Sequence, residues 1–200
     1  GNRLKTIKPE WIYIGSRDCD LTNSKQCGIL IKDTSPDAIV HIAARVGGIK
    51  DNAERQAEFY YDNVMINTNV INEAKKAGVP RVLSSLSTCC FPNVVDSYPF
   101  SESAVLSGPP APTNLSYGFA KRALFVQTVA YRKQYGVNYS CFSPSNLYGP
   151  EDHFNNQKSH FVAAMIKKMF EASDGDNIEF WGTGRPLRQQ YRSTSHRCTK

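Results

Sequence analysis

Tyr117 and Lys121 are the residues whose types and spacing point most directly to catalysis. Four residues apart on a helix, two side chains share one face. A phenol has a pKa of about 10, and a neighbouring ammonium lowers that pKa because it favours the phenolate. The pair could therefore exchange a proton with a carbonyl or an alcohol during hydride transfer. Tyr and Lys at this spacing are also common on solvated helix faces, which is the competing interpretation.

A second reactive group, Ser87, Thr88 and Cys89, directly follows an apolar run that predicts a strand. Its hydroxyls could hold a substrate carbonyl beside Tyr117. The Cys89 thiol could act as a base if a neighbouring cation favours its thiolate. The alternatives are ordinary turn chemistry for the hydroxyls and an inert buried thiol for Cys89.

Two further candidates lie nearer the ends of the chain. His160 opens a predicted helix, and its near-neutral pKa would suit an acid, although a lone His is more often structural or exposed. Arg17, Asp18 and Asp20 follow a predicted strand, at the position where dinucleotide-binding folds meet the adenosine ribose. An Arg there suits the 2′-phosphate of NADP, whereas the alternative is a charged turn with a helix cap.

The elements that must position these residues alternate between short apolar runs and amphipathic stretches. Strands are predicted over residues 11–14, 38–42, 81–86, 138–142 and 177–181, and helices over residues 22–32, 52–77, 117–135 and 160–172. This alternation predicts an α/β fold, with a parallel sheet covered by helices on both faces. Ligands bind such sheets at the carboxyl ends of the strands. Nearly every reactive cluster follows a predicted strand, so we expect these residues at that edge.

Composition limits the class of protein. The chain has 200 residues, which suffices for one to one and a half domains with a real core. Its net charge is +6, but five basic residues follow Glu179 without an acid, and the rest carries +1. We therefore expect no nucleic-acid partner. No apolar run reaches the roughly 20 residues that span a bilayer, and no leader is evident, so neither a membrane nor secretion is expected. The six cysteines lack CxxC spacing, which favours reduced cytoplasmic thiols over a metal site.

Five ordered segments together resemble one family. They are residues 41–49 (HIAARVGGI), 86–92 (LSTCCFP), 117–121 (YGFAK), 144–154 (PSNLYGPEDHF) and 181–188 (WGTGRPLR). Each is similar to a segment of the GDP-L-fucose synthases, which belong to the extended short-chain dehydrogenase/reductase family. The resemblance implies a doubly wound, Rossmann-type parallel sheet that binds NADP(H). It also implies a cytoplasmic homodimer that epimerises a GDP-bound 4-keto-6-deoxy sugar at C3 and C5 and reduces it at C4.

The resemblance assigns roles to matching residues. Tyr117 would be the general acid for reduction, with Lys121 lowering its pKa and holding the nicotinamide ribose. Ser87 would position the sugar, and Cys89 and His160 would be the base and acid that invert C3 and C5. Cofactor contacts are expected from Arg17, Asp18, Asp20, Ala43, Ala44, Ser85, Leu86, Ser87, Lys121, Pro144, Ser145, Asn146, Leu147 and His160. Substrate contacts are expected from Lys168, Trp181 and Arg188.

Both ends of the chain depart from the family pattern. Family members begin with a strand and a Gly-x-x-Gly-x-x-Gly turn that cradles the pyrophosphate, and at most Gly1 of that turn is present. We expect residues 1–158 to form an NADP-binding domain without its first strand. Residues 159–189 would begin a substrate domain, and residues 190–200 would be a tail outside the family pattern.

Two alternatives to the synthase stay open. One is another nucleotide-sugar epimerase or dehydratase of the same fold, which would have no need of Cys89 and His160 as a pair. The other is a truncated product without catalytic activity, which the departures at both ends favour.

Overall fold

The computed structural model describes residues 2–47, 49–95, 99–150, 152, 154, 159–180, 183–184 and 190–192. Its contacts divide the chain into two units, Gly1–Pro144 and Ser145–Lys200, and each is described by itself. The helices and strands of the first unit are α1 (Asn2–Ile7), α2 (Ser24–Thr34), β1 (Ile39–His41), α3 (Ile49–Glu54), α4 (Gln56–Lys76), β2 (Arg81–Ser85), α5 (Leu115–Tyr135) and β3 (Asn138–Phe142). Three short 3-10 helices join them: η1 (Thr88–Cys90), η2 (Glu102–Leu106) and η3 (Pro112–Asn114).

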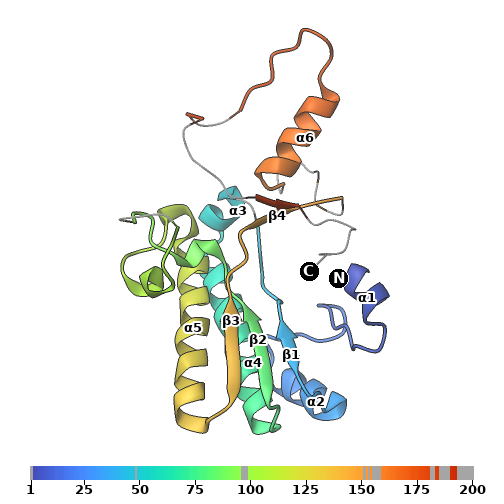
Figure 1. Cartoon of the computed structure of the whole chain (residues 1–200), viewed down its shortest axis with the longest axis vertical. Coiled ribbons are helices and arrows are strands. Elements are labelled where there is room, and N and C mark those ends of the chain that lie inside the picture. The colour runs from blue at the N-terminus through green and yellow to red at the C-terminus, as the bar shows by residue number, and fades with distance from the viewer. Residues whose placement is uncertain are drawn as a thin grey trace. The chain divides into compact units, whose positions relative to one another are not determined.

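The three strands of the first unit form a parallel sheet in the order β1-β2-β3 (Figure 1). Its register places Val40 opposite Leu83, and Val82 opposite Tyr139. Parallel neighbours need a crossover connection, which α4 supplies between β1 and β2 and α5 supplies between β2 and β3. The predicted α/β class with a Rossmann-type parallel sheet is confirmed.

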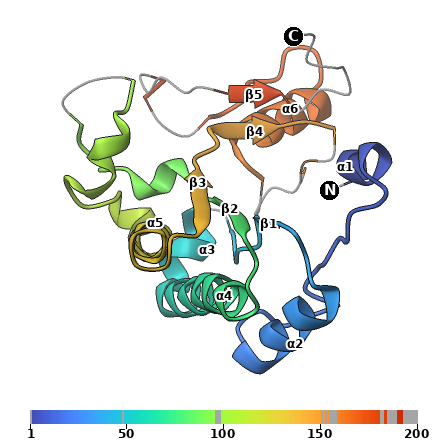
Figure 2. The ribbon, with the colours of Figure 1, turned by 60° about the horizontal axis from the view of Figure 1, so that its bottom comes forward.

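Helices α4 and α5 lie side by side along one face of this sheet (Figure 2). Alternate strand residues point to that face, so Val82 and Tyr139 are fully buried. Leu83 and Phe142 point to the opposite face, where each is 39% exposed. The core therefore lies between the sheet and the α4–α5 layer. Its buried members are Cys27, Ile31, Val70, Ile71, Ala74, Val79, Val82, Leu86, Cys90, Val105, Leu124 and Tyr139.

Buried asparagines on α4 attach the loops of the unit to this core. Asn63 bonds both backbone groups of Arg45, with its Oδ1 and Nδ2 each 3.0 Å from the atom bonded. Asn69 Nδ2 donates to the carbonyls of Leu21 and Thr22, at 2.8 and 2.9 Å. Asn is a poor helix former, so its place on α4 reflects these long-range hydrogen bonds and not helix propensity.

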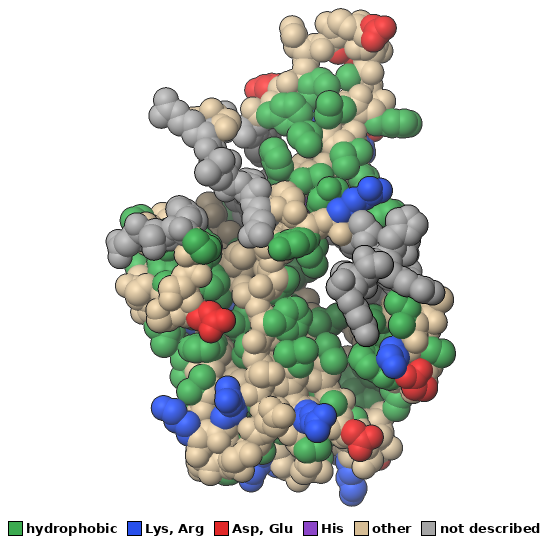
Figure 3. All heavy atoms as spheres, in the orientation of Figure 1, with side chains coloured by type: hydrophobic (Ala, Val, Ile, Leu, Met, Phe, Trp, Pro, Cys, Tyr) green, Lys and Arg blue, Asp and Glu red, His purple; other side chains and the backbone are tan. Residues whose placement is uncertain are grey.

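The last turns of the two long helices, α4 and α5, carry cationic side chains. Lys75 and Lys76 occupy the last turn of α4, and Arg132 and Lys133 that of α5, where they oppose the partial negative charge of the helix C-terminus. Figure 3 shows Lys and Arg side chains gathered at this lower end of the unit. Neither these helices nor any other described helix has the length and apolar character needed to cross a bilayer.

The strand predicted over residues 11–14 is wrong. The segment has no strand conformation, and Trp11, Ile12 and Ile14 are 44, 63 and 43% exposed. A strand exists only through hydrogen bonds to a neighbour, and among the described strands β1 pairs with β2 alone. β-Branched residues without such a neighbour do not make a strand.

Other predicted boundaries moved by a few residues. The helix predicted over 22–32 begins at Ser24, because the Asn23 side chain caps it by accepting from the amides of Lys25 and Gln26. The helix predicted over 52–77 is two helices, α3 and α4, separated at Arg55. The strand predicted over 138–142 is β3 with the same limits.

The second unit contains β4 (Asn146–Tyr148), α6 (Phe161–Glu171) and β5 (Gln190–Arg192). β4 pairs with β5 in parallel, although β5 lies within residues 190–200, where sequence analysis predicted a tail outside the family pattern. Residues 177–180 form no strand. The predicted domain limits at 158 and 189 stay predictions.

A buried histidine makes the stability of the first unit depend on pH. His41 Nε2 lies 2.9 Å from Asn67 Oδ1, and the imidazole is 4% exposed. Burial lowers the pKa of His41 from 6.5 to about 4, and the nearby Lys121 ammonium lowers it further, against the opposing effect of the hydrogen bond that His41 Nε2 donates to Asn67 Oδ1. As pH falls, the unfolded chain therefore takes up a proton before the folded one. Stability is full above pH 6.5, and roughly 3 kcal/mol is lost as pH falls through the folded pKa.

Urea unfolding at about pH 7 and about pH 4.5 measures this loss. His41→Gln cannot titrate but can still form a hydrogen bond, so the stability difference between the two pH values should shrink. An identical difference in the parent and in His41→Gln would show that His41 does not carry the pH dependence.

Candidate active site

Reactive side chains follow β2 at the carboxyl edge of the sheet. The strand ends at Ser85, and the amide of Leu86 extends the pairing by donating to Phe142 O at 2.8 Å. Ser87 then caps the η1 turn, because its Oγ accepts the amide proton of Cys89 at 3.2 Å. The predicted Ser87–Cys89 group is therefore held at the edge where parallel sheets bind ligands.

Helix α5 presents Lys121 to the end of β2. The ammonium is 2% exposed and donates to the carbonyl of Ser85 at 2.8 Å. Burial lowers the pKa of Lys121 to about 8, although the Cys141 and Cys90 thiols act in the opposite direction. An ammonium carries three N–H donors, and the other two have no acceptor among the described residues.

Tyr117 lies four residues before Lys121 on the same face of α5. Burial raises the pKa of Tyr117, the Cys89 thiol raises it further, and a hydrogen bond with the Ser87 side chain lowers it. The predicted lowering by Lys121 is wrong in this structure. The Lys121 ammonium lies 5.8 Å from the centre of the Tyr117 ring and is directed to Ser85, so it does not offset the burial of the phenol.

These effects place Ser87, Cys89 and Tyr117 in one cluster. The side chains of Ser87 and Cys89 lie near enough to the Tyr117 phenol to influence its pKa, and the Cys89 side chain is partly exposed. A phenol with a raised pKa stays protonated at neutral pH and can act as a proton donor. The described cluster therefore combines a protonated phenol, a hydroxyl and a partly exposed thiol.

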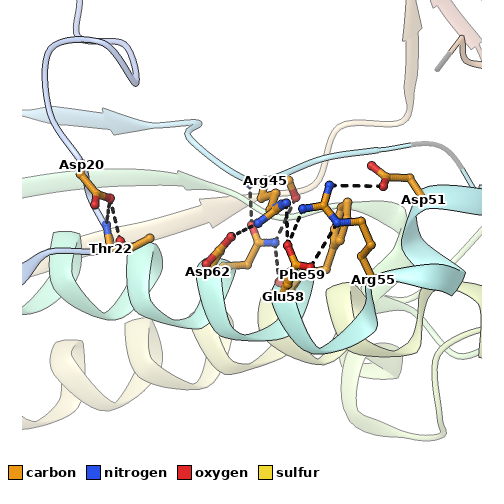
Figure 4. A network of polar contacts seen from close by, with 9 residues as sticks. Asp20, Thr22, Arg45, Asp51, Arg55, Glu58, Phe59 and Asp62 are labelled. Atoms are coloured by element: carbon orange, nitrogen blue, oxygen red, sulfur yellow. Dashed lines mark hydrogen bonds and ion pairs between the residues drawn. The ribbon is translucent and has the colours of Figure 1, made fainter.

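The loop after β1 carries Ala43 and Ala44, both partly buried, and is fixed to α4. Besides the bonds from Asn63, the Arg45 guanidinium pairs with Asp62 and Glu58 (Figure 4). Glu58 also pairs with Arg55, so the ion pairs continue toward α3. The network holds the alanines at the carboxyl edge of the sheet, as the prediction of cofactor contacts there requires.

Arg17, Asp18 and Asp20 form two tight turns before α2. Asp18 Oδ2 accepts from the amide of Gly15 at 2.7 Å, and Asp20 Oδ1 accepts from the amide and hydroxyl of Thr22 at 2.9 and 2.7 Å. The hydrogen bonds from Thr22 lower the pKa of Asp20. Both carboxylates thus stabilise their own turns, and Asp20 does not cap α2. Arg17 is exposed and forms no ion pair with another described residue.

The second unit holds several of the predicted site residues. His160 is exposed at the N-cap of α6, and Lys168 on the same helix donates to Glu179 O at 2.6 Å. The other members are Ser145, Asn146 and Leu147, at and just before β4. Because the two units are described separately, convergence of His160 with Cys89 stays a prediction.

Three predicted site residues remain: Pro144, Trp181 and Arg188. Pro144 is the last residue of the first unit and is partly buried. Trp181 and Arg188 lie outside the described residues. Their predicted contacts with substrate therefore stay predictions.

The described residues fit a nicotinamide cofactor. Two N–H donors of the buried Lys121 ammonium have no described acceptor, which suits a ribose with vicinal hydroxyls. Ser145 Oγ is likewise buried without a partner among the described residues of its unit. Polar atoms in this condition are expected where a ligand completes the hydrogen bonding.

Sequence analysis missed the buried pair of His41 and Asn67. The pair lies against α5 near Lys121, since Asn67 Nδ2 also donates to the carbonyl of Ala120, at 3.5 Å, and Lys121 influences the pKa of His41. A signal was present in the repeated asparagines of α4, because Asn63 and Asn67 are four residues apart and share a face with apolar residues.

Comparison with known proteins identifies the family. Residues 2–190 match the NAD dependent epimerase/dehydratase family. A probable GDP-L-fucose synthase of Drosophila melanogaster is 38% identical over 197 residues, which cover 93% of this chain and 61% of the relative. The GDP-L-fucose synthase of Dictyostelium discoideum is 36% identical over 180 residues, which cover 90% of this chain and 56% of the relative. The chain thus spans less than two thirds of the length of these relatives.

Solved structures agree with this relationship. The crystal structure of a GDP-L-fucose synthetase from Naegleria fowleri bound to NADP superimposes with a TM-score of 0.84 at 31% sequence identity. The superposition covers 96% of this chain and 61% of that protein. With a matching sequence, a parallel sheet and a Ser–Tyr–Lys cluster at its carboxyl edge, the chain belongs to the NAD dependent epimerase/dehydratase family.

Proposed function

We propose that the protein carrying this chain is an NADPH-dependent GDP-L-fucose synthase. It would invert C3 and C5 of GDP-4-dehydro-6-deoxy-D-mannose and reduce the C4 carbonyl. The observation that carries the proposal is the clustering of Cys89 with Ser87 and Tyr117 at the edge of the sheet. A simple epimerase or dehydratase has use for the hydroxyl and the phenol but no need of the thiol. The relatives named GDP-L-fucose synthase support the choice of substrate.

The three side chains suit successive steps on one sugar. The 4-keto group makes the protons at C3 and C5 acidic, so the Cys89 thiolate could remove them and His160 could return a proton from the opposite face of the ring. Ser87 would hold the ketone oxygen. The protonated Tyr117 would donate its proton to that oxygen as C4 is reduced, and its raised pKa keeps it in the donor form. NADPH supplies the hydride when it is bound.

Residues that could contact NADPH lie in two places: Lys121 on α5, for the nicotinamide ribose, and Arg17 before α2, for the 2′-phosphate. Lys121 has N–H groups to offer to the nicotinamide ribose, and Tyr117 lies on the same face of α5. Arg17 is exposed and unpaired among the described residues, so its guanidinium is available for a 2′-phosphate, which would favour NADPH over NADH. The Naegleria fowleri protein bound to NADP supports this assignment.

A second copy of the chain is the proposed partner of α5. Every exposed residue of this helix between its start and Ala130 is apolar: Leu115, Phe119, Ala123, Val126 and Ala130. Together with Tyr60 and Leu106, several of them line a surface hollow of about 820 Å³. The exposed residues of this stripe carry no charge, although the buried Arg122 also lines the hollow. The stripe can therefore face its own copy across a two-fold axis without repulsion between exposed charges, which suits a homodimer.

A cytoplasmic location completes the proposal. All five described cysteines are free thiols, Cys19, Cys27, Cys89, Cys90 and Cys141. Reduced thiols are usual in the cytosol, where disulfides are rare. A thiol that works as a base must also stay reduced, which the same compartment favours.

Replacing the proton donor tests the reduction step. We measure activity in a chimera in which this chain replaces the matching part of the Drosophila melanogaster relative. Tyr117→Phe should slow NADPH oxidation about 100-fold or more, because a positioned acid is lost. Exchange of the C3 and C5 protons should persist, since it does not need the phenol. Reduction at the parent rate would remove Tyr117 from the mechanism.

Replacing the thiol and the imidazole tests the epimerisation step in the same chimera. Cys89→Ser and His160→Ala should each suppress deuterium uptake from solvent at C3 and C5 far more than they weaken NADPH binding. Cys19→Ser, which changes a cysteine in the turn before α2, is the matched control and should exchange like the parent. If both site variants exchange deuterium at the parent rate, the synthase proposal fails in favour of a simpler epimerase or dehydratase.

A charge placed in the apolar stripe tests the homodimer. Val126→Asp would bury a carboxylate twice across the two-fold axis, so sedimentation velocity of the chain should show monomers in place of dimers. Val94→Asp, at an 81% exposed position outside α5, should leave the dimer intact. A monomeric parent chain, or a dimer unaffected by Val126→Asp, would contradict the proposed interface.

A further inference from the structure

Arg122 is a buried cation beside the catalytic helix positions, and neither proposed half-reaction uses it. Its side chain is 6% exposed, and Nε donates to the carbonyl of Cys90 at 2.6 Å. The guanidinium lies 5.4 Å from the centre of the Phe119 ring, and Nη2 is buried without an acceptor among the described residues. Burying a cation that makes one hydrogen bond costs more free energy than burying a well-packed apolar residue of similar size. A buried arginine at this position therefore needs an explanation other than stability.

The carbonyl that Arg122 binds belongs to the turn that carries Cys89. This η1 turn is short and has only two backbone hydrogen bonds across it, from Cys90 to Ser87 and from Phe91 to Thr88, at 3.0 and 3.1 Å. So short a turn is weak by itself. The side chain of Arg122 binds its last residue to α5.

Helix α5 meets the same segment at two other points. Lys121 binds the carbonyl of Ser85 before the turn, and Gly118 brings the helix against the turn itself. A Cβ at Gly118 would lie 2.5 Å from the carbonyl oxygen of Cys89, so the backbones are in close contact there. The segment from Ser85 to Cys90 is thus attached to α5 at both ends, and Arg122 makes the side-chain hydrogen bond at the Cys90 end.

We propose that Arg122 is a positioning residue for Cys89, which fixes the thiol relative to Tyr117 by holding the Cys90 carbonyl. This inference rests on the proposed function of Cys89. Tyr117 and Lys121 are on α5 itself and do not depend on this hydrogen bond. Loss of Arg122 should therefore separate the two half-reactions, impairing exchange at C3 and C5 but not binding of NADPH.

Amide hydrogen exchange in this chain tests the attachment without any assay of activity. In Arg122→Met, which is apolar and of similar length, the amides of Cys90 and Phe91 should exchange about tenfold faster, as expected when a charged donor is lost. Amides in β2 and in the rest of α5 should keep their rates. Arg132→Met makes the same change in the last turn of α5 and should alter nothing near the turn. Unchanged exchange at Cys90 and Phe91, or equal acceleration throughout the unit, would overturn the proposal.

The chimera tests the consequence for chemistry. Arg122→Met should reduce deuterium uptake at C3 and C5 about tenfold or more while the Kd for NADPH stays within about twofold of the parent value. Arg122→Lys retains a donor and should restore part of the uptake. Parent-like uptake in Arg122→Met, or equal losses of uptake and NADPH binding, would overturn the positioning role. A parent chimera without uptake would instead refute the proposed function, and hydrogen exchange would then decide whether Arg122 holds the turn.

Discussion

The candidate site depends on one hydrogen bond, from the buried Lys121 ammonium to the carbonyl of Ser85. A cation that is 2% exposed is stable only with an acceptor, and this acceptor is the last carbonyl of β2. The bond therefore fixes α5 against the end of the strand. Tyr117, one helical turn earlier, then lies beside Ser87, and the turn with Cys89 follows.

The second support of the site is helix α4. Two of its asparagines form hydrogen bonds to loops: Asn63 to the loop after β1, and Asn69 to the loop before α2. Asn63 fixes the backbone of Arg45 after β1, and Asn67 joins His41 to the carbonyl of Ala120 beside Lys121. Buried polar groups are stable when each finds a partner, and a satisfied network also makes the arrangement unique. Helix α4 thus fixes loops that carry predicted cofactor contacts.

The different environments of Tyr117 and Cys89 suit the two side chains to different proton-transfer steps. Burial keeps the Tyr117 phenol protonated, whereas the Cys89 thiol is partly exposed at the same edge. A protonated phenol gives a proton to a developing alkoxide, and a thiol can cycle through its thiolate to remove one. One cluster therefore suits both proposed steps, with Cys89 as the group that removes protons and Tyr117 as the group that donates a proton during reduction.

The sequence by itself determined the class of fold and most helices and strands, and it predicted that Ser87, Cys89 and Tyr117 would lie together. Periodicity over neighbouring residues decides such elements, so β3 has its predicted limits and α5 begins only two residues early. Tertiary structure alone decided where Lys121 points, why Asn67 is buried and what Arg122 binds. These contacts join residues 36, 26 and 32 positions apart, and no local pattern encodes them. The strand predicted over residues 11–14 failed for the same reason, because a strand needs a neighbour that its own residues cannot supply.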